Sequence, residues 1–532
     1  MKAFILLQAQ PFLFEWWQIL LAATPVLLLI ILMGFLKMSG DKSALITLVV
    51  AVLIALIAYG FSFADAGLSV VYGFLKAFFP ILIIIIMAIF SYNVLVHTGN
   101  MEIIKQQFSS LSSDKSVQVL LLTWGFGGLL EGMAGFGTAV AIPAAILIGL
   151  GFKPVFSAVV SLIANSVATG FGAVGTPVKV LAEQAGITDI QTLSSHVVFQ
   201  LSPLMFIIPF ILVFLTDSSA KKLPGHILLS FLVGGISLVT QYLAARYMGA
   251  ETPAILGSIA SILVIVLYAK ITERNHPKDQ TEATVKYSFG DTLKAWSVYG
   301  IILVLIIATS PLLPIRNMLS PLLTTAFKFN IFDVTGGADV ARSVSISWLI
   351  DAGVLLFVGS LVGGLIQGAK IGGLFRVLGR VIVQQRKTIV TVCSLIAMSS
   401  VMDFAGMINI LGVTLAYATG SFYPLFAPTI GCIGTFLTGS DTSSNILFGK
   451  LQASVAHATG ADPSWLAAAN TAGATGGKII SPQSIAVATS ACGQQGQEGA
   501  IMKKALPYAL LYIVVAGLMV YFGPRLLGGL IA

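Results

Sequence analysis

Two apolar segments of the chain share one pattern of polar and helix-breaking residues. In each, an Asn is followed by Ser or Thr, then by glycines, and then by a hydroxyl residue and Pro: Ala164-Asn165-Ser166, Gly172, Gly175 and Thr176-Pro177 in the first, and Ala469-Asn470-Thr471, Gly473, Gly476, Gly477 and Ser481-Pro482 in the second. Gly and Pro disfavour a continuous helix. A broken helix presents N–H groups and the positive end of its dipole, which suit a carboxylate. Paired interrupted helices in two halves of a chain indicate a transporter's substrate site. The alternative is that the small residues only allow tight helix packing.

Carboxyl groups occur inside apolar stretches at three positions. Glu131 and Asp441 each stand beside a turn-rich sequence, and Asp403 lies in Met402-Asp403-Phe404. A carboxylate near the membrane centre costs about 2.5–3.5 kcal/mol on insertion scales, so it is a functional candidate by default. We predict that these three residues are candidates for proton coupling. The alternative is a structural carboxylate paired with Lys179, Lys478 or the backbone.

The predicted substrate-binding residues are polar groups and glycines near the two breaks and the two turns. They are Gly135, Thr138, Asn165, Ser166, Gly175, Thr176, Ser443, Ser444, Asn445, Asn470, Thr471, Lys478 and Gln483. Lys478 could neutralise a substrate carboxylate or Asp441, whereas Lys179 is expected to extend to the membrane surface. The sequence contains neither HExxH nor GxSxG and no metal-ligand spacing. We therefore predict a protein that is not an enzyme, with no catalytic residue, metal or cofactor.

The composition predicts a membrane protein. The chain has 532 residues, of which 57% are hydrophobic and 9% charged, against about 25% charged in soluble domains. Its net charge of +8 is expected from basic cytoplasmic loops, because the basic residues are scattered among short loops, and we predict no nucleic-acid partner.

The apolar runs predict an all-α polytopic fold. We expect twelve transmembrane helices, about 16–37, 42–60, 78–98, 153–185, 191–216, 223–247, 251–271, 294–312, 346–369, 388–418, 463–491 and 504–528. Two further runs, 116–151 and 421–459, are too long for one crossing and are predicted to be re-entrant hairpins, with tips at Glu131 and Asp441. Each half then holds one hairpin and one broken helix (153–185 and 463–491).

The expected organisation is two repeats of opposite orientation. Residues 1–65 would be N-terminal helices, 66–271 the first repeat, 272–293 a cytoplasmic linker and 294–532 the second repeat. Most of the 29 basic residues fall on one side of these crossings, which makes that side cytoplasmic. Both termini would then lie outside, and the two hairpins would open to opposite faces.

The same residues resemble the bacterial L-lactate permease family. The resemblance covers nearly the whole chain and rests on the strings Leu130-Glu131-Gly132-Met133-Ala134-Gly135-Phe136-Gly137-Thr138, Leu162-Ile163-Ala164-Asn165-Ser166, Phe171-Gly172-Ala173-Val174-Gly175-Thr176-Pro177, Asp441-Thr442-Ser443-Ser444-Asn445 and Ser481-Pro482-Gln483. It implies symport of lactate or glycolate with protons. The family is similar to a wider ion-transporter superfamily, in which Ser-Asn-Thr hairpin tips bind substrate and coupling ion. Ser444-Asn445-Ile446 departs from that pattern, which favours protons over sodium.

The predicted function is proton-coupled symport of L-lactate and related 2-hydroxy monocarboxylates, including D-lactate and glycolate, across the inner (plasma) membrane. The partners are this anion, a proton and the lipid bilayer, and a homodimer is compatible with the prediction. The alternatives are a sodium-coupled dicarboxylate-type carrier of the same superfamily, a channel and a membrane-embedded enzyme. The dicarboxylate carrier should have more cationic groups in its core than Lys179 and Lys478.

Overall fold

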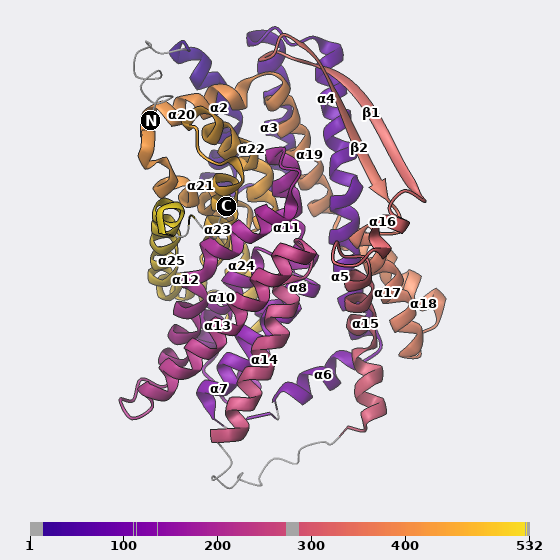
Figure 1. The fold of residues 1–532 in the computed structure, drawn as a ribbon, viewed down its shortest axis with the longest axis vertical. Coiled ribbons are helices and arrows are strands. Elements are labelled where there is room, and N and C mark those ends of the chain that lie inside the picture. The colour runs from indigo at the N-terminus through magenta and orange to yellow at the C-terminus, as the bar shows by residue number, and fades with distance from the viewer. Residues whose placement is uncertain are drawn as a thin grey trace.

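The computed structural model describes residues 14–109, 111–112, 114–135, 137–272, 287–526 and 528 (Figure 1). In this part of the chain, ten helices are long and apolar enough to cross a membrane, or eleven when the bent pair Pro154–Thr169 and Gly172–Ala185 counts as one span. The fold is therefore that of a polytopic helical membrane protein, as predicted. The predicted linker 272–293 and the two chain ends lie largely outside the described residues.

The first half of the chain forms a succession of helices. They are α2 (Trp16–Ile30), η1 (Ile31–Phe35), α3 (Gly40–Ala58), α4 (Phe63–Lys76), η2 (Ala77–Leu82), α5 (Ile83–His97), α6 (Asn100–Ser109), α7 (Lys115–Val119), η3 (Leu120–Phe126), α8 (Gly127–Met133), α9 (Thr138–Gly149), α10 (Pro154–Thr169), α11 (Gly172–Ala185), α12 (Ile190–Thr216), α13 (Leu223–Met248) and α14 (Pro253–Thr272).

The second half adds further helices and two strands. They are α15 (Phe289–Ala308), α16 (Ile315–Leu319), β1 (Thr324–Asp333), β2 (Ala338–Ser347), α17 (Ala352–Ile366), α18 (Ile371–Gln384), α19 (Arg386–Phe404), α20 (Met407–Thr419), η5 (Gly420–Phe422), α21 (Tyr423–Thr438), α22 (Asp441–Thr459), α23 (Pro463–Lys478), α24 (Pro482–Ala491) and α25 (Glu498–Leu526).

Each segment predicted to be a hairpin contains two helical arms that pack against each other. Residues 116–151 contain the arm from α7 to α8 and the returning helix α9, and residues 421–459 contain α21 and α22. Glycines in the left-handed region close the tips: Gly137 precedes α9, and Gly439 ends α21. Glycine suits these positions because a side chain would strain this backbone conformation.

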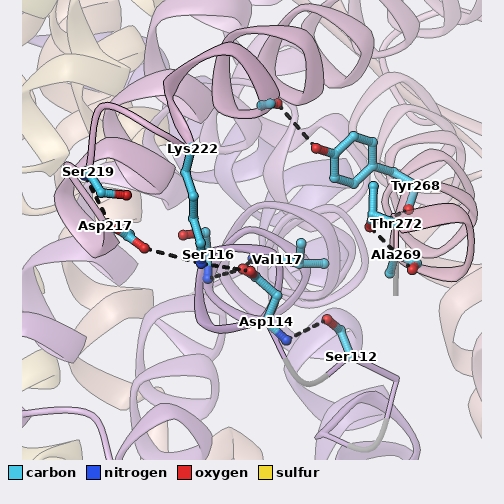
Figure 2. A network of polar contacts seen from close by, with 11 residues as sticks. Ser112, Asp114, Ser116, Val117, Asp217, Ser219, Lys222, Tyr268, Ala269 and Thr272 are labelled. Carbon is cyan, nitrogen blue, oxygen red and sulfur yellow. Dashed lines mark hydrogen bonds and ion pairs between the residues drawn. The ribbon is translucent and has the colours of Figure 1, made fainter. Parts of the chain in front are cut away.

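The first hairpin is tied to the loop between α12 and α13 by a polar network (Figure 2). Asp114 accepts hydrogen bonds from the backbone N–H groups of Ser116 and Val117 and so caps α7. The Nζ of Lys222 lies 3.1 Å from the Oδ2 of Asp114 and 3.1 Å from the Oδ2 of Asp217. Hydrogen bonds from Ser219 lower the pKa of Asp217 to about 2, and the two carboxylates raise the pKa of Lys222. Asp217 and Lys222 therefore remain ionised at neutral pH.

Two predicted crossings differ in the structure. The segment 388–418 is divided into α19 and α20, and the chain turns at Ala405 and Gly406, where Gly406 has a φ of +78°. The helix expected at 346–369 begins only at Ala352, because β2 extends to Ser347 and a turn follows it. Hydropathy missed the first break because Gly406 lies within a continuous apolar run.

A β-hairpin occupies most of the loop expected at 313–345, so the all-α prediction is incomplete there. Strands β1 and β2 pair antiparallel, from Thr324 opposite Ser347 to Asp333 opposite Ala338. Alternating apolar and polar residues suit a strand with one buried face. Ile331, Val344 and Ile346 are the buried members.

The helices pack in two groups, which we name after α19 and α23. In the α19 group, α19 packs on α3 and α4, and α17 packs on α5 and α15. In the α23 group, α23 packs on α12, α21, α22 and α25, and α11 packs on α22. Figure 1 shows α15, α17 and α18 on one side of the molecule and α12 and α13 on the other. Contacts of α11 with α5 and of α22 with α19 join the groups.

Candidate substrate site

A cavity of about 390 Å³ lies where the two helix groups meet both hairpin tips. Its lining combines the starts of α11 and α24 with the starts of α3 and α19. The lining residues Ser39 and Lys387 are exposed and mark its mouth. The volume falls within the range of small-molecule sites, about 300–1,000 Å³.

Both hairpin tips pack against α24. A Cβ added at Gly137 would lie 3.2 Å from Val487, and one added at Gly439 would overlap Gln483. Gly135, with a φ of +62°, packs in the same way against Ala173. These positions accept no side chain without displacement of a neighbour, so the glycines allow the tips to close on the site.

The two predicted broken helices, 153–185 and 463–491, are called the first and second polar spans. In the first, the break is a left-handed turn rather than a simple gap. Ala173, Val174 and Gly175 have φ values of +43°, +56° and +72°. This conformation is rare for a β-branched residue and is a form of backbone strain found at functional sites. The Oγ1 of Thr176 donates to the carbonyl of Ala173 at 2.6 Å. The lining residues Gly172 and Ala173 bring this turn to the cavity.

The break in the second polar span comes after the glycines at which it was predicted. Helix α23 continues through Gly473, Gly476 and Gly477 to Lys478, and α24 starts at Pro482. Cβ atoms at Gly473 and Gly477 would overlap the carbonyl oxygens of Pro428 and Cys432 on α21. The prediction that these glycines break the helix is therefore wrong. They allow close packing of α21 on α23. The next helix begins at Pro482, and the Oγ of Ser481 caps it by accepting a hydrogen bond from the backbone N–H of Ser484.

Lys478 pairs with Glu131 rather than with Asp441. The Nζ of Lys478 donates to the Oε1 of Glu131 at 2.9 Å, and the two side chains are 11% and 2% exposed. The Oε1 also lies against Gly172, where any Cβ would be too close to it. The pair thus connects the first hairpin, the first break and the end of α23.

Asp441 has free hydrogen-bonding capacity at the second hairpin. It is 2% exposed, and its Oδ1 accepts from the Oγ1 of Thr435 at 3.2 Å. Its Oδ2 and the Oε2 of Glu131 are buried and accept no hydrogen bond from the described residues. Both residues line the cavity. A buried acceptor without a donor is costly, so these oxygens are suited to a proton or to a ligand's donor group.

Asn445, Asn470 and Thr471 form a polar network behind the lining. The Nδ2 of Asn470 donates to the Oδ1 of Asn445 at 2.9 Å. The Nδ2 of Asn445 lies 2.9 Å from the carbonyl of Pro177 and 2.9 Å from the Oγ1 of Thr471. These bonds connect α22 to both polar spans, so the three side chains position the site without lining the cavity.

The first Asn also lies behind the lining. The Nδ2 of Asn165 donates to the Oγ1 of Thr169 at 3.2 Å, and Thr169 lines the cavity. The Oγ of Ser166 donates to the carbonyl of Ile163. The two polar spans meet nearby, because a Cβ at Gly170 would lie 3.1 Å from Thr471.

The predicted residues thus divide into a lining set and a supporting set. The cavity is lined by Gly135, Ser443, Lys478, Gln483, Glu131 and Asp441. The residues outside the lining are Thr138, Asn165, Ser166, Gly175, Thr176, Ser444, Asn445, Asn470, Thr471 and Asp403. Asp403 takes no part in either set. Its side chain is 31% exposed near the end of α19, and its Oδ2 lies 3.5 Å from the Nζ of Lys450.

Sequence reasoning missed several polar lining residues. Thr169, Ser440, Thr442 and Ser484 adjoin predicted positions and could have been included by proximity. Asp41, at the start of α3, and Gln385 and Lys387, at the start of α19, lie far away in the sequence, and no local signal marks them.

A polar cavity enclosed by two hairpin tips and two interrupted spans, within a bundle of apolar helices, defines the protein as a membrane transporter. The chain belongs to the L-lactate permease family, whose sequence profile matches residues 18–527. The chain is therefore a permease and not an enzyme.

Relatives of known name span nearly the same length. The chain is 39% identical over 451 residues to an L-lactate permease of Streptococcus iniae, covering 85% of this chain and 93% of that protein. It is 32% identical over 536 residues to glycolate permease GlcA of Escherichia coli (strain K12), covering 94% of each. Among solved structures, MtrF of Neisseria gonorrhoeae, from a class of antimetabolite efflux pumps, matches with a TM-score of 0.51 at 11% identity, covering 92% of this chain and 96% of that one. That similarity concerns the fold alone.

Proposed function

We propose that the protein carries L-lactate, and with it D-lactate and glycolate, across the plasma membrane together with a proton. The names of its relatives support this substrate class. The observation on which the proposal depends is the cavity at the hairpin tips, where Lys478, Glu131 and Asp441 line the inner part and Asp41 and Lys387 come from the starts of α3 and α19.

The charges of the lining suggest how anion and proton are coupled. Lys478 and Glu131 compensate each other across 2.9 Å. An anionic substrate would then meet Asp441, whose Oδ2 accepts no hydrogen bond from the described residues. Two carboxylates close together repel each other strongly at low dielectric. A proton on Asp441 removes this repulsion, so anion and proton enter the site together.

The membrane potential is a second reason to expect that the anion moves together with a proton. At neutral pH a 2-hydroxy acid is ionised, and a potential of about 100 mV, negative inside, opposes its uptake by about 2.3 kcal/mol. One accompanying proton cancels the charge moved and adds the driving force of the pH gradient.

We propose that lining groups on both hairpins and on α23 and α24 hold the substrate. Ser443, Gln483 and the Nζ of Lys478 supply donors for its carboxylate and hydroxyl groups. Asn165, Asn445, Asn470 and Thr471 keep the two broken spans in register around it. The proposed orientation in the membrane places the basic loops and the cavity mouth on the cytoplasmic side and both termini outside. The two repeats are then inverted relative to each other.

Uptake by purified protein in liposomes tests the proposal. An imposed gradient, acidic outside, should drive accumulation of radiolabelled L-lactate, and D-lactate or glycolate should compete for it. Uptake that follows a sodium gradient and ignores pH would instead support the sodium-coupled carrier. Competition by succinate but not by glycolate would reject the monocarboxylate substrate.

A further inference from the structure

The cavity mouth and Asp403 lie at opposite ends of α19. Thr388 and Thr391, near the start of this helix, line the cavity, whereas Asp403 stands near its C-terminal end. At 1.5 Å per residue, Asp403 is roughly 20 Å farther along the helix axis than Thr388. Asp403 therefore does not belong to the substrate site.

The partner of Asp403 comes from the other helix group. The Nζ of Lys450 on α22 lies 3.5 Å from the Oδ2 of Asp403, with side chains 29% and 31% exposed. Helix α22 begins at the lining residue Asp441, and Lys450 is about two and a half turns farther along it. The ion pair thus joins the two groups beyond the site.

Two polar contacts between the same groups lie at the far end of α11. The Nζ of Lys76 on α4 donates to the carbonyl of Glu183 at 3.4 Å. The Oγ of Ser399 on α19 donates to the Oε1 of Gln184 at 3.3 Å. Helix α11 begins at the cavity with Gly172 and ends at Ala185, so these contacts also lie on the side remote from its start.

The β-hairpin supports the α19 side of this junction. The backbone N–H of Val334, at its turn, donates to the carbonyl of Phe404 at 2.9 Å. The Phe404 ring packs edge to face on Tyr72, and the guanidinium of Arg342 lies 5.8 Å from its centre. The end of α19 that carries Asp403 is thereby held to α4 and to β2.

We propose that the Asp403–Lys450 ion pair, with the Lys76 and Ser399 contacts, is a latch that closes the cavity on the side opposite its mouth. The latch must open for substrate to reach the cavity from that side. This inference rests on the proposed transport function. Partly exposed ion pairs are weak and readily exchanged for water, which suits a contact made and broken in every cycle, in contrast to the buried Lys478–Glu131 pair.

A reversible crosslink tests the latch. Cys393, Cys432 and Cys492 are first replaced by Ser, and Asp403→Cys and Lys450→Cys are introduced together. A short bifunctional methanethiosulfonate reagent should reduce lactate uptake at least 10-fold, and dithiothreitol should restore it. The matched control is Asp217→Cys with Lys222→Cys, a pair at 3.1 Å within one loop, where the same reagent should leave uptake unchanged. Full uptake by crosslinked D403C/K450C protein would overturn the latch.

A second measurement separates the latch from the transport function. Thr388→Cys places a thiol at the cavity lining, and its labelling by a membrane-impermeant maleimide reports how often the mouth is open. Labelling should fall about 1.5- to 5-fold in D403N, which loses one weak ion pair. The charge exchange D403K/K450D should restore labelling. Labelling that D403N leaves unchanged would reject the latch, whereas absence of lactate uptake in every variant, parent included, would reject the function alone.

Discussion

At the scale of single residues, the hairpin tips contribute one carboxyl group with a cationic partner, Glu131, and one without such a partner among the described residues, Asp441. The carboxylate of Glu131 forms an ion pair with Lys478. Asp441 accepts a hydrogen bond on one oxygen only, from the hydroxyl of Thr435. The two acids therefore have different roles in the proposed cycle. Glu131 positions Lys478, and Asp441 is the candidate proton carrier.

Removing Lys478 alone should be more damaging to stability than removing the pair. Lys478→Met leaves the Glu131 carboxylate buried without a counter-charge, and breaking a buried pair in this way costs about 3–5 kcal/mol. The double variant K478M/E131Q should recover most of that stability while uptake remains lost. Thermal unfolding in detergent measures the first effect and liposome uptake the second. Equal destabilisation by the single and double variants would show that the pair is not coupled.

Replacing the proposed proton carrier should separate binding from accumulation. Asp441→Asn keeps the shape of the side chain but cannot release a proton. We expect exchange of internal for external lactate to continue, while accumulation driven by a pH gradient falls at least 10-fold. A pH-sensitive dye inside the liposomes measures the accompanying proton. Retention of proton-driven accumulation would transfer the role to another group.

At the scale of elements, glycines decide how closely α21 and α23 approach. The carbonyl of Pro428 occupies the space that a Cβ at Gly473 would need, and that of Cys432 does the same at Gly477. Helix α23 carries Asn470, Thr471 and Lys478, so its packing sets the position of three site residues at once.

A single methyl group added to α23 on the side that packs against α21 should therefore displace the site residues that α23 carries. Gly473→Ala forces backbone apart from backbone and is expected to destabilise by about 1–3 kcal/mol and to impair uptake. Gly379→Ala on α18 is the control, because nothing lies within 4 Å of its added Cβ. That change should be neutral or stabilise by about 0.5–1 kcal/mol. Unfolding temperature and uptake of both variants check the contrast, which an unaffected G473A protein would contradict.

At the scale of the whole molecule, the two helix groups enclose a cavity whose exposed lining residues Ser39 and Lys387 belong to the starts of α3 and α19, and the proposed latch lies at the other end of α19. The polar network at the first hairpin, with Asp114, Lys222 and Asp217, is separate from that cavity. Because the two sets of charged groups are separate, variants of Asp217 and of Asp441 can show which set causes the pH dependence of transport.

The pH dependence of uptake should come from the cavity and not from this network. The folded-state pKa of Asp217, about 2, lies below its ordinary value of 3.8. Its stabilising contribution is therefore present above about pH 4 and lost only as the pH falls toward 2. The raised pKa of Lys222 keeps its contribution throughout the range below its ordinary value of 10.5.

Between pH 5 and 8 Asp217 and Lys222 stay ionised, so Asp217→Asn should leave the shape of the uptake–pH profile unchanged. Asp441→Asn should flatten the same profile. Initial rates of lactate uptake over this range check both expectations. A profile altered by D217N would place a proton-linked step at the first hairpin.

The sequence by itself determined the class of the protein and the identity of its broken spans. Low charge and long apolar runs require lipid as the surroundings, and the paired Asn, Gly and Pro patterns mark segments that cannot all be plain helix. Glu131, Asp441, Lys478 and Ser443 could be chosen because polar groups in apolar runs need a local reason. The β-hairpin and the break at Gly406 could not be located, because alternation in a loop and one glycine in an apolar run are weak local signals.

Only the tertiary structure decided which residue meets which. Lys478 and Glu131 belong to different halves of the chain, as do Asn445 and Pro177, and their pairing depends on how the hairpins close. The same close packing moves Asn470 behind the cavity lining and turns Gly473 and Gly477 from helix breakers into packing contacts. Asp403 and Asp441 are both carboxyl groups within long apolar runs, yet Asp441 lines the cavity and Asp403 lies near the far end of α19.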